Sequence, residues 1–256
     1  MLRPRIIPCL LIHNRGLVKT VNFNKPKYVG DPINAVKIFN EKEVDELIVL
    51  DIDATVQGHE PDFEMIKNLA AECRMPLCYG GGVKTVSEAK KIINLGAEKV
   101  ALSASVLANP LLVSEISEAV GKQSVIVILD VKKKGLFGHY ELFTHNGTIS
   151  TGKNPRDFAI EMEKLGVGEI VINSIDNDGM MKGYDMKLIQ SIREAVSVPI
   201  TALGGAGNLS DIKNLINKFG IMGAAAGSLF VFKGVYKAVL INYPKQTEIR
   251  ELLKIN

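Results

Sequence analysis

The chain has 256 residues, of which 46% are hydrophobic and 23% charged, a composition typical of a soluble globular protein. Its length suffices for one α/β barrel of about 250 residues or for two smaller domains. The net charge of +3 is too small, and the aromatic content of 6% too low, to indicate a nucleic-acid or membrane surface, so we expect neither partner.

The three cysteines, Cys9, Cys73 and Cys78, form no metal-spaced cluster, and any disulfide would leave one unpaired. We therefore expect reduced thiols in a cytoplasmic protein, with no metal ion and no cofactor. The basic and apolar first 12 residues resemble a signal peptide, but Pro8 interrupts them and no small-residue cleavage site follows. We expect a first strand there, and no apolar run reaches the roughly 18 residues of a membrane helix.

Short apolar runs, rich in β-branched residues, recur along the whole chain. Such runs are typical of parallel strands covered on both faces. We predict eight strands, at residues 6–12, 47–51, 76–79, 99–103, 124–130, 169–173, 199–203 and 222–226. Amphipathic stretches between them predict helices at residues 32–43, 62–72, 86–95, 110–120, 155–165, 186–195 and 209–219. Three of these helices begin at a proline that follows a capping residue: Asp31-Pro32, Asn109-Pro110 and Asn154-Pro155.

With a final helix at about 234–240, this alternation predicts a single-domain (β/α)8 TIM barrel of the ribulose-phosphate-binding type over residues 1–256. A doubly wound sheet is the alternative, although GxGxxG does not follow the first strand. Two segments do not fit simple strand–helix units. Residues 15–28 predict a loop over the barrel mouth, and residues 132–152, which contain Asn146-Gly147, predict a hairpin.

The run at 124–130 ends in Asp130, and α/β barrels carry their chemistry at the carboxyl ends of their strands. Asp130 is therefore the main catalytic candidate, although a strand-end Asp also serves as a turn cap. The same two interpretations apply to Asp51, Asp176 and Asp178, which follow other predicted strands. The four histidines show no pairing with a nucleophile and indicate no metal site.

Glycine turns recur in the two halves of the chain, about 1–121 and 122–256, which indicates duplication of a half-barrel. Gly204 lies 124 positions after Gly80, and small hydroxyl residues follow the next strand in each half. Glycine turns at strand ends leave backbone N–H groups free to bind phosphate. We predict one phosphate site at Gly205 and Ser228 and a second at Gly82 and Ser103, with tight turns as the alternative.

The end of the first strand lacks the partner that Asp130 requires for acid–base chemistry. In a two-fold repeated barrel the equivalent carboxylate would end that strand, but the sequence there is Cys9-Leu-Leu-Ile12. Only the Cys9 thiol titrates in this segment, and Cys9 has the character of a small core residue.

The chain resembles the cyclase subunit of imidazole glycerol phosphate synthase along almost its whole length. Ten blocks match in order: Arg5-Ile-Ile-Pro-Cys-Leu10, Val18-Lys-Thr-Val-Asn-Phe23, Gly30-Asp-Pro32, Asp45-Glu-Leu47, Leu50-Asp-Ile52, Tyr79-Gly-Gly-Gly-Val83, Thr144-His-Asn-Gly147, Ser174-Ile-Asp-Asn-Asp-Gly179, Gly183-Tyr-Asp185 and Gly204-Gly-Ala-Gly207. That family is a (β/α)8 barrel. It receives ammonia from a separate glutaminase subunit, conducts it along the barrel axis and cyclises a bisphosphorylated ribulosyl substrate at the C-terminal face.

The resemblance assigns roles residue by residue. Asp130 matches one of two catalytic carboxylates, and Lys19 matches a lysine of the substrate loop. The predicted phosphate-binding residues are those of the glycine turns and of the loop after the sixth strand: Gly82, Ser103, Asp178, Gly179, Gly205 and Ser228. Four residues match the charged ring through which ammonia enters, on the face where a class I glutaminase docks: Arg5, Glu46, Lys99 and Glu169.

The departures lie at the opposite end of the barrel. The other catalytic Asp of the family falls on Leu11, its Asn-Thr phosphate pair is Ser103-Ala104, and its Thr on the sixth strand is Asn173. Loss of one member of an acid–base pair costs 10²–10⁴-fold in rate. This pattern resembles a paralogue that supplies ammonia for an acetamidino group on a nucleotide-sugar in bacterial surface-polysaccharide (lipopolysaccharide) synthesis.

Three functions therefore remain open from the sequence. The first is a synthase subunit of the paralogous glutamine amidotransferase, with a phosphorylated small-molecule substrate and a sugar amidotransferase as a further partner. The second is genuine imidazole glycerol phosphate formation in histidine biosynthesis, with Asp130 alone or with a displaced acid such as Asp51. The third is a non-catalytic ammonia conduit that activates a glutaminase.

Overall fold

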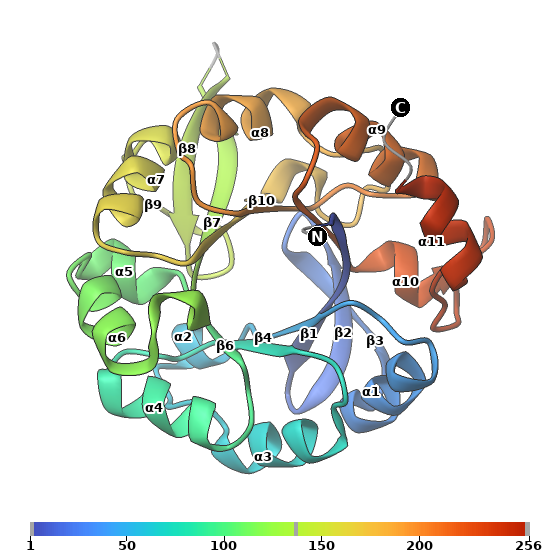
Figure 1. The fold of residues 1–256 in the computed structure, drawn as a ribbon, viewed down its shortest axis with the longest axis horizontal. Helices are drawn as coiled ribbons and strands as arrows, with labels where there is room; N and C mark the ends of the chain where they lie inside the picture. The colour runs from blue at the N-terminus through green and yellow to red at the C-terminus, as the bar shows by residue number, and fades with distance from the viewer. Residues whose placement is uncertain (1–2, 136–137, 254–256) are drawn as a thin grey trace.

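Eight parallel strands close into a barrel in the computed structural model, which describes residues 3–135 and 138–253 (Figure 1). In chain order they are β1 (Arg5–His13), β4 (Leu47–Asp51), β5 (Leu77–Gly80), β6 (Lys99–Leu102), β7 (Val125–Lys134), β10 (Glu169–Ser174), β11 (Ile200–Leu203) and β12 (Gly223–Ala226). Each strand pairs in parallel with the next, and β12 pairs with β1 to close the ring. The predicted (β/α)8 barrel is confirmed.

Helices surround the barrel (Figure 1). The seven predicted between strands are present, with shifted ends: α1 (Pro32–Glu41), α3 (Phe63–Glu72), α4 (Val86–Asn94), α6 (Leu112–Val120), α7 (Pro155–Lys164), α8 (Met186–Arg193) and α9 (Leu209–Phe219). Short helices follow three strands: α2 (Ala54–Gln57), α5 (Ala104–Ala108) and α10 (Ser228–Val231). In the described ranges, no helix has the length and apolar character needed to cross a membrane.

Two of the three predicted helix starts are confirmed. The side chains of Asp31 and Asn154 accept backbone N–H groups of the first turns of α1 and α7, each with a proline at the next position. The prediction for Asn109-Pro110 is wrong, because α6 begins only at Leu112. The N–H of Asn109 closes the preceding helix α5 on Ser105, so this residue ends one helix instead of starting the next.

The predicted final helix at 234–240 is wrong. The segment belongs to a hairpin in which β13 (Phe232–Lys233), just before it, pairs with β14 (Ala238–Val239) inside it, and the last helix, α11, lies at Gln246–Leu252. Gly234 and Lys237 adopt φ angles of +73° and +48°, which a right-handed helix does not allow. Val235 and Tyr236 are 94% and 97% exposed, so the apolar residues of this segment pack on nothing in the barrel.

Antiparallel hairpins extend β1 and β7 at the carboxyl end of the barrel. Residues 15–28 form more than the predicted loop, because β2 (Gly16–Val21) pairs with both β1 and β3 (Asn24–Gly30). The predicted hairpin at 132–152 is confirmed, with β8 (His139–Thr144) paired to β7 and to β9 (Ile149–Ser150). Residues 136–137 of that segment lie outside the described ranges.

Small and apolar side chains fill the barrel interior in a cluster separate from the one under the helices: Ile7, Cys9, Ile48, Cys78, Ala101, Ile126, Ile128, Val171, Leu203 and Ala225. Leu11 and Leu50 pack on this cluster. Alternate residues of a strand point to the same face, so Arg5, Ile7, Cys9 and Leu11 of β1 all point into the barrel. An apolar column therefore separates Arg5 at one end from Leu11 at the other.

Candidate active site

A cavity opens at the carboxyl ends of the barrel strands and encloses about 1120 Å³ of empty space, counted out to its open mouth. All eight predicted catalytic and phosphate-binding residues, and Leu11 at the missing acid position, line this cavity or the pocket beside it. Those that line the cavity itself are Leu11, Lys19, Ser103, Asp130, Asp178, Gly179, Gly205 and Ser228. Gly82 lines the adjoining pocket, as does Ser103. The structure therefore brings the predicted residues together, and their roles stay predictions.

Asp130 lies on β7 and reaches the cavity. Its Oδ1 accepts a hydrogen bond from Asn173 Nδ2 at 2.8 Å, and its Oδ2 a longer one from Ser103 Oγ at 3.4 Å. Burial raises the pKa of the carboxyl to about 7, against these two hydrogen bonds, and the charge of Asp178 adds to the rise. A carboxyl group with a pKa near 7 can take up or release a proton at neutral pH.

No acid from β1 faces Asp130, because Leu11 occupies that position of the cavity lining. Two other carboxylates, Asp51 and Asp178, line the same cavity, and both already have structural partners. Asp51 accepts the backbone N–H groups of Asp53 and Ala54 and so caps the turn into α2. Burial raises the pKa of Asp51, against the effect of these two hydrogen bonds.

Asp178 connects the β2–β3 hairpin to the loop after β10. Its Oδ2 accepts Thr20 Oγ1 at 2.7 Å and the backbone N–H of Phe23 at 3.3 Å. Gly179 permits the close approach, since a Cβ there would lie 2.1 Å from Thr20 O. The carboxylate therefore fixes the hairpin, and its negative charge does not itself favour phosphate.

Lys19 extends from β2 into the cavity and is only 4% exposed. Its Nζ donates to the carbonyl oxygen of Cys9. Burial lowers the pKa of this lysine. Among the lining residues that the structure describes, Lys19 is the one lysine or arginine of the main cavity, so it is the natural counter-charge for an anionic substrate.

The two predicted phosphate turns lie in adjoining pockets. Gly205 has φ +112° and a Cβ there would lie 2.1 Å from Gly183 O, so the close turn beside Ser228 requires glycine. Gly82 has φ +73° and lies with Ser103 in the second pocket. The two pockets share Ser103 in their lining, so an elongated substrate can reach both turns at once.

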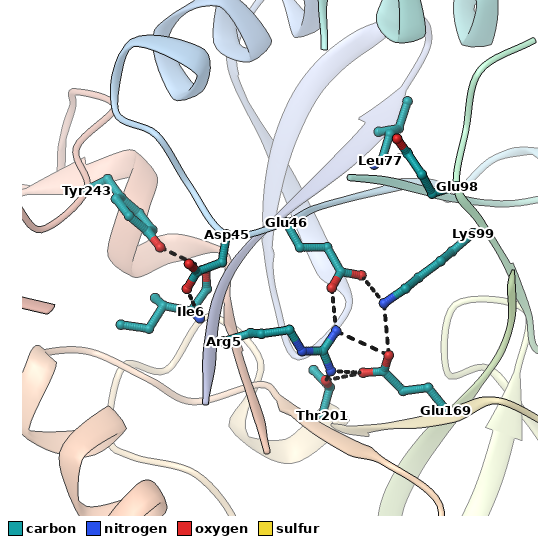
Figure 2. A network of polar contacts seen from close by, with 10 residues as sticks. All are labelled: Arg5, Ile6, Asp45, Glu46, Leu77, Glu98, Lys99, Glu169, Thr201 and Tyr243. Atoms are coloured by element: carbon teal, nitrogen blue, oxygen red, sulfur yellow. Dashed lines mark hydrogen bonds and ion pairs between the residues drawn. The ribbon is translucent and has the colours of Figure 1, made fainter. Parts of the chain in front are cut away.

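The amino-terminal end of the barrel is closed by the charged ring of Arg5, Glu46, Lys99 and Glu169 (Figure 2). Arg5 pairs with Glu46 and, at 2.6 Å, with Glu169, whereas Lys99 contacts Glu46 at 2.7 Å and Glu169 at 3.1 Å. Burial acts against the charge of Glu169, but Arg5 and Lys99 outweigh it and lower the pKa of this carboxyl. Every charge of the ring therefore has opposite charges on both sides.

Several polar residues of the two ends were not among the sequence candidates. Thr20, Thr144, His145 and Asn146 line the cavity from the two hairpins. The matching block at 144–147 and the expected mouth loops pointed to these segments but not to individual side chains. Thr201 donates to Glu169 inside the ring, and only its polar character within an apolar strand could have indicated it.

Fold and cavity together define a (β/α)8 barrel whose candidate site lies at the carboxyl ends of its strands. The chain belongs to the family of histidine biosynthesis proteins, whose family model matches residues 5–237, and relatives that match it are named as HisF subunits of imidazole glycerol phosphate synthase. The recognition made from the matching sequence blocks is therefore confirmed.

Three relatives illustrate the similarity. A Vibrio vulnificus (strain YJ016) protein with the provisional name imidazole glycerol phosphate synthase subunit hisF3 is 54% identical over 100% of this chain and 98% of its own length. The provisionally named hisF2 of Pseudomonas aeruginosa is 51% identical over 95% of this chain and 97% of its own. Imidazole glycerol phosphate synthase subunit HisF of Clostridium botulinum (strain Okra) is 37% identical over 96% and 97%.

Proposed function

We propose that this chain is the synthase subunit of a glutamine amidotransferase, which receives ammonia at the charged ring and uses it in the cavity at the other end. The observation that carries the proposal is the arrangement along one axis. The ring, the apolar interior and the cavity with Asp130 follow one another inside the barrel. A neutral molecule as small as ammonia crosses an apolar interior at lower cost than an ion, because it needs no desolvation of charge.

The partner is a class I glutaminase at the amino-terminal face. The side chains of Arg5 and Lys99 keep 26% and 17% of their surface exposed, whereas the two glutamates below them are almost fully covered. A docked subunit can therefore contact the cationic members of the ring and shift them. Such a shift would open the axis, because these two side chains hold the ring closed.

The cavity supports the paralogous role in acetamidino modification of a nucleotide-sugar. Leu11 stands where the cyclisation reaction requires a second acid, and leucine cannot relay a proton. The relatives at 51–55% identity carry provisional names, and two of these names are numbered hisF2 and hisF3. Four HisF subunits named without reservation, from Clostridium botulinum strains and Exiguobacterium sibiricum, are 36–40% identical to this chain. The ammonia acceptor would then be held by a sugar amidotransferase.

Formation of imidazole glycerol phosphate is the second candidate function. It is favoured by the names of the relatives, by Asp130 and by the two adjoining glycine turns, which suit a bisphosphorylated substrate. A pure conduit is the limiting case of the first proposal, in which the ring transfers ammonia and Asp130 does no chemistry.

The test combines the chain with a glutaminase subunit of this synthase class. We expect the chain to increase glutamine hydrolysis at least tenfold and Lys99→Met to abolish the increase. With [amide-¹⁵N]glutamine in excess unlabelled ammonium, we expect label in an acetamidino nucleotide-sugar when its amidotransferase is added, and little in imidazole glycerol phosphate. No stimulation of hydrolysis would contradict the proposal. Efficient labelling of imidazole glycerol phosphate would favour the second candidate.

A further inference from the structure

Asn173 contains an unused acceptor at the base of the cavity. It lies on β10, is 5% exposed, and its Nδ2 donates to Asp130 Oδ1. Within the described ranges its Oδ1 has no hydrogen-bond partner. A buried amide oxygen without a partner costs about 1–3 kcal/mol, so native proteins rarely leave one unless a ligand or water completes it.

This buried oxygen lies between the cavity and the packed interior of the barrel. Asn173 and Gly204 both line the cavity, and a Cβ on Gly204 would lie 3.2 Å from Asn173 Oδ1. Val171, two residues earlier on β10, and Leu203, which pairs with Asn173 from β11, belong to the apolar cluster of the barrel interior. The free acceptor is thus at the point where the apolar column meets the cavity.

Asp130 supplies a second acceptor at the same place. The hydrogen bond between the two side chains holds the amide against the carboxylate, so covalent geometry keeps Asn173 Oδ1 within a few ångströms of Asp130. The other carboxylate oxygen, Oδ2, has only the long contact to Ser103. Lys19 does not use these acceptors, since its Nζ donates to the Cys9 carbonyl oxygen.

Acceptors on two side chains in contact suit a small ligand that carries several N–H donors. An anion such as phosphate would be repelled by the carboxylate. No group of three potential metal-ligating side chains occurs in the part of the chain that the structure describes. Ammonia satisfies both acceptors at once and is small enough to emerge from the apolar interior.

We propose that Asn173 Oδ1 and the Asp130 carboxylate form the subsite that receives ammonia where the barrel interior opens into the cavity. This inference rests on the proposed function, because it assumes that ammonia is delivered through the barrel. Asn173 and Asp130 hold the nitrogen through two N–H donors, with the shared proton on either the nitrogen or Asp130. Asn173 is then a ligand-binding residue at a position where the cyclase family has threonine.

The test uses the whole chain with ¹⁵N-labelled asparagine. The side-chain NH₂ signal of Asn173 is identified by its loss in Asn173→Thr. Ammonium chloride is then titrated in, with potassium chloride at matched ionic strength as the control for charge and size. We expect a saturable shift of the Asn173 signal with ammonium and none with potassium. Asp130→Asn, which preserves the shape of the pair, should weaken the apparent affinity at least tenfold.

Asn94→Thr carries the same substitution at an exposed position on α4 and should leave the Asn173 response unchanged. An equal shift with potassium would overturn the proposal in favour of a simple cation site, and the absence of a saturable shift would show that only water completes Asn173. Either result can coincide with stimulated glutamine hydrolysis, in which case the proposed function stands without this subsite. Conversely, a specific ammonium response without stimulated hydrolysis would support the subsite and contradict the proposed glutaminase partner.

Discussion

The two ends of the barrel hold buried carboxylates whose acidities move in opposite directions. At the amino-terminal end, Arg5 and Lys99 outweigh the effect of burial and lower the pKa of Glu169. At the carboxyl end, burial prevails and raises the pKa of Asp130 to about 7. The difference lies in the neighbours: Glu169 has two cations within 3.1 Å, whereas Asp130 has an amide and a hydroxyl.

The two ends of the barrel also differ in how completely their polar groups are hydrogen-bonded. The charges of the ring neutralise one another, so the ring is complete without a ligand. At the cavity, Asn173 keeps an acceptor without a partner among the described residues, and Lys19 is held with a lowered pKa. A network in which every polar group is paired indicates a structural role and control of access, whereas a buried polar group without a partner indicates a ligand-binding site.

The largest expected effect is on catalysis at the cavity end. Asp130→Asn preserves the shape and the contact to Asn173 but removes the group that titrates near neutral pH, so ammonia-dependent product formation should fall 10²–10⁴-fold. Steady-state assays with the proposed acceptors measure this. Asp31→Asn makes the same exchange at the exposed cap of α1, where asparagine caps equally well, and should change the rate less than twofold. An Asp130→Asn enzyme of full activity would assign the chain to the conduit role.

At the ring end we expect a loss of stability instead. Glu169→Gln leaves Arg5 and Lys99 to share Glu46, so the ring keeps one positive charge without a counter-charge. Leaving a buried charge uncompensated costs about 3–5 kcal/mol. Urea unfolding at pH 7 measures this difference. Glu98→Gln is the matched control, because Glu98 lies beside the ring but bonds the backbone N–H of Leu77, which a glutamine oxygen can also accept (Figure 2). Equal losses for the two variants would contradict a ring held by charge.

The raised pKa of Asp130 predicts an opposite pH dependence from that of Glu169. Its contribution to stability is full below about pH 4 and is lost as the pH rises to about 7, because the folded protein resists ionisation while the unfolded chain does not. A rise of about three pH units corresponds to about 4 kcal/mol, and residual solvent contact through the cavity reduces this to about 2–4 kcal/mol.

Unfolding of the wild type and Asp130→Asn at pH 4 and pH 8 tests this dependence. The variant should gain stability relative to the wild type by that amount at the higher pH. A constant difference between the two proteins would show that Asp130 has an ordinary pKa. Glu169, whose pKa is lowered, should instead lose its contribution as the pH falls below about 4.

The smallest expected effect concerns the glycine turn beside Ser228. Gly205→Ala adds both backbone strain and a contact of 2.1 Å with Gly183 O, so it should cost about 1–3 kcal/mol and weaken inorganic phosphate binding. Gly220→Ala, at φ +74° with nothing within 4 Å, carries the strain without the contact. Calorimetric titration with phosphate should therefore show a loss of affinity only for Gly205→Ala. Unchanged phosphate binding in both variants would leave this turn as a purely structural one.

The strand and helix order of the barrel could be predicted because buried parallel strands and capped helices leave local patterns. Residues 124–130 and 209–219 are examples in which periodicity and flanking residues agree. The β2–β3 hairpin left no such pattern: its residues Asn22, Phe23 and Lys25 adopt positive φ angles that only tertiary contacts, such as those with Asp178, stabilise. The prediction of a final helix at 234–240 failed for a related reason, because Gly234 and Lys237 adopt left-handed conformations.

The sequence predicted which residues form the site but not the contacts between them. Asp130 could be proposed from its strand end, and Leu11 from the absence of an acid at the equivalent place. The contact between Asp130 and Asn173 joins residues 43 positions apart, and the ring joins Arg5 to Glu169 across 164 positions. No local pattern encodes such pairs, so the ring depended on the family resemblance and the free acceptor of Asn173 required the structure.

The cyclisation assay at position 11 tests the contrast between the two ends most directly. Wild type and Leu11→Asp are each supplied with ammonium and the bisphosphorylated ribulosyl substrate, and imidazole glycerol phosphate is measured. With no acid at position 11 to act with Asp130, the wild type should turn over slowly, and a carboxylate introduced there should raise the rate at least tenfold. Rapid turnover by the wild type that Leu11→Asp leaves unchanged would contradict the account, because the missing carboxylate would then have no bearing on the chemistry.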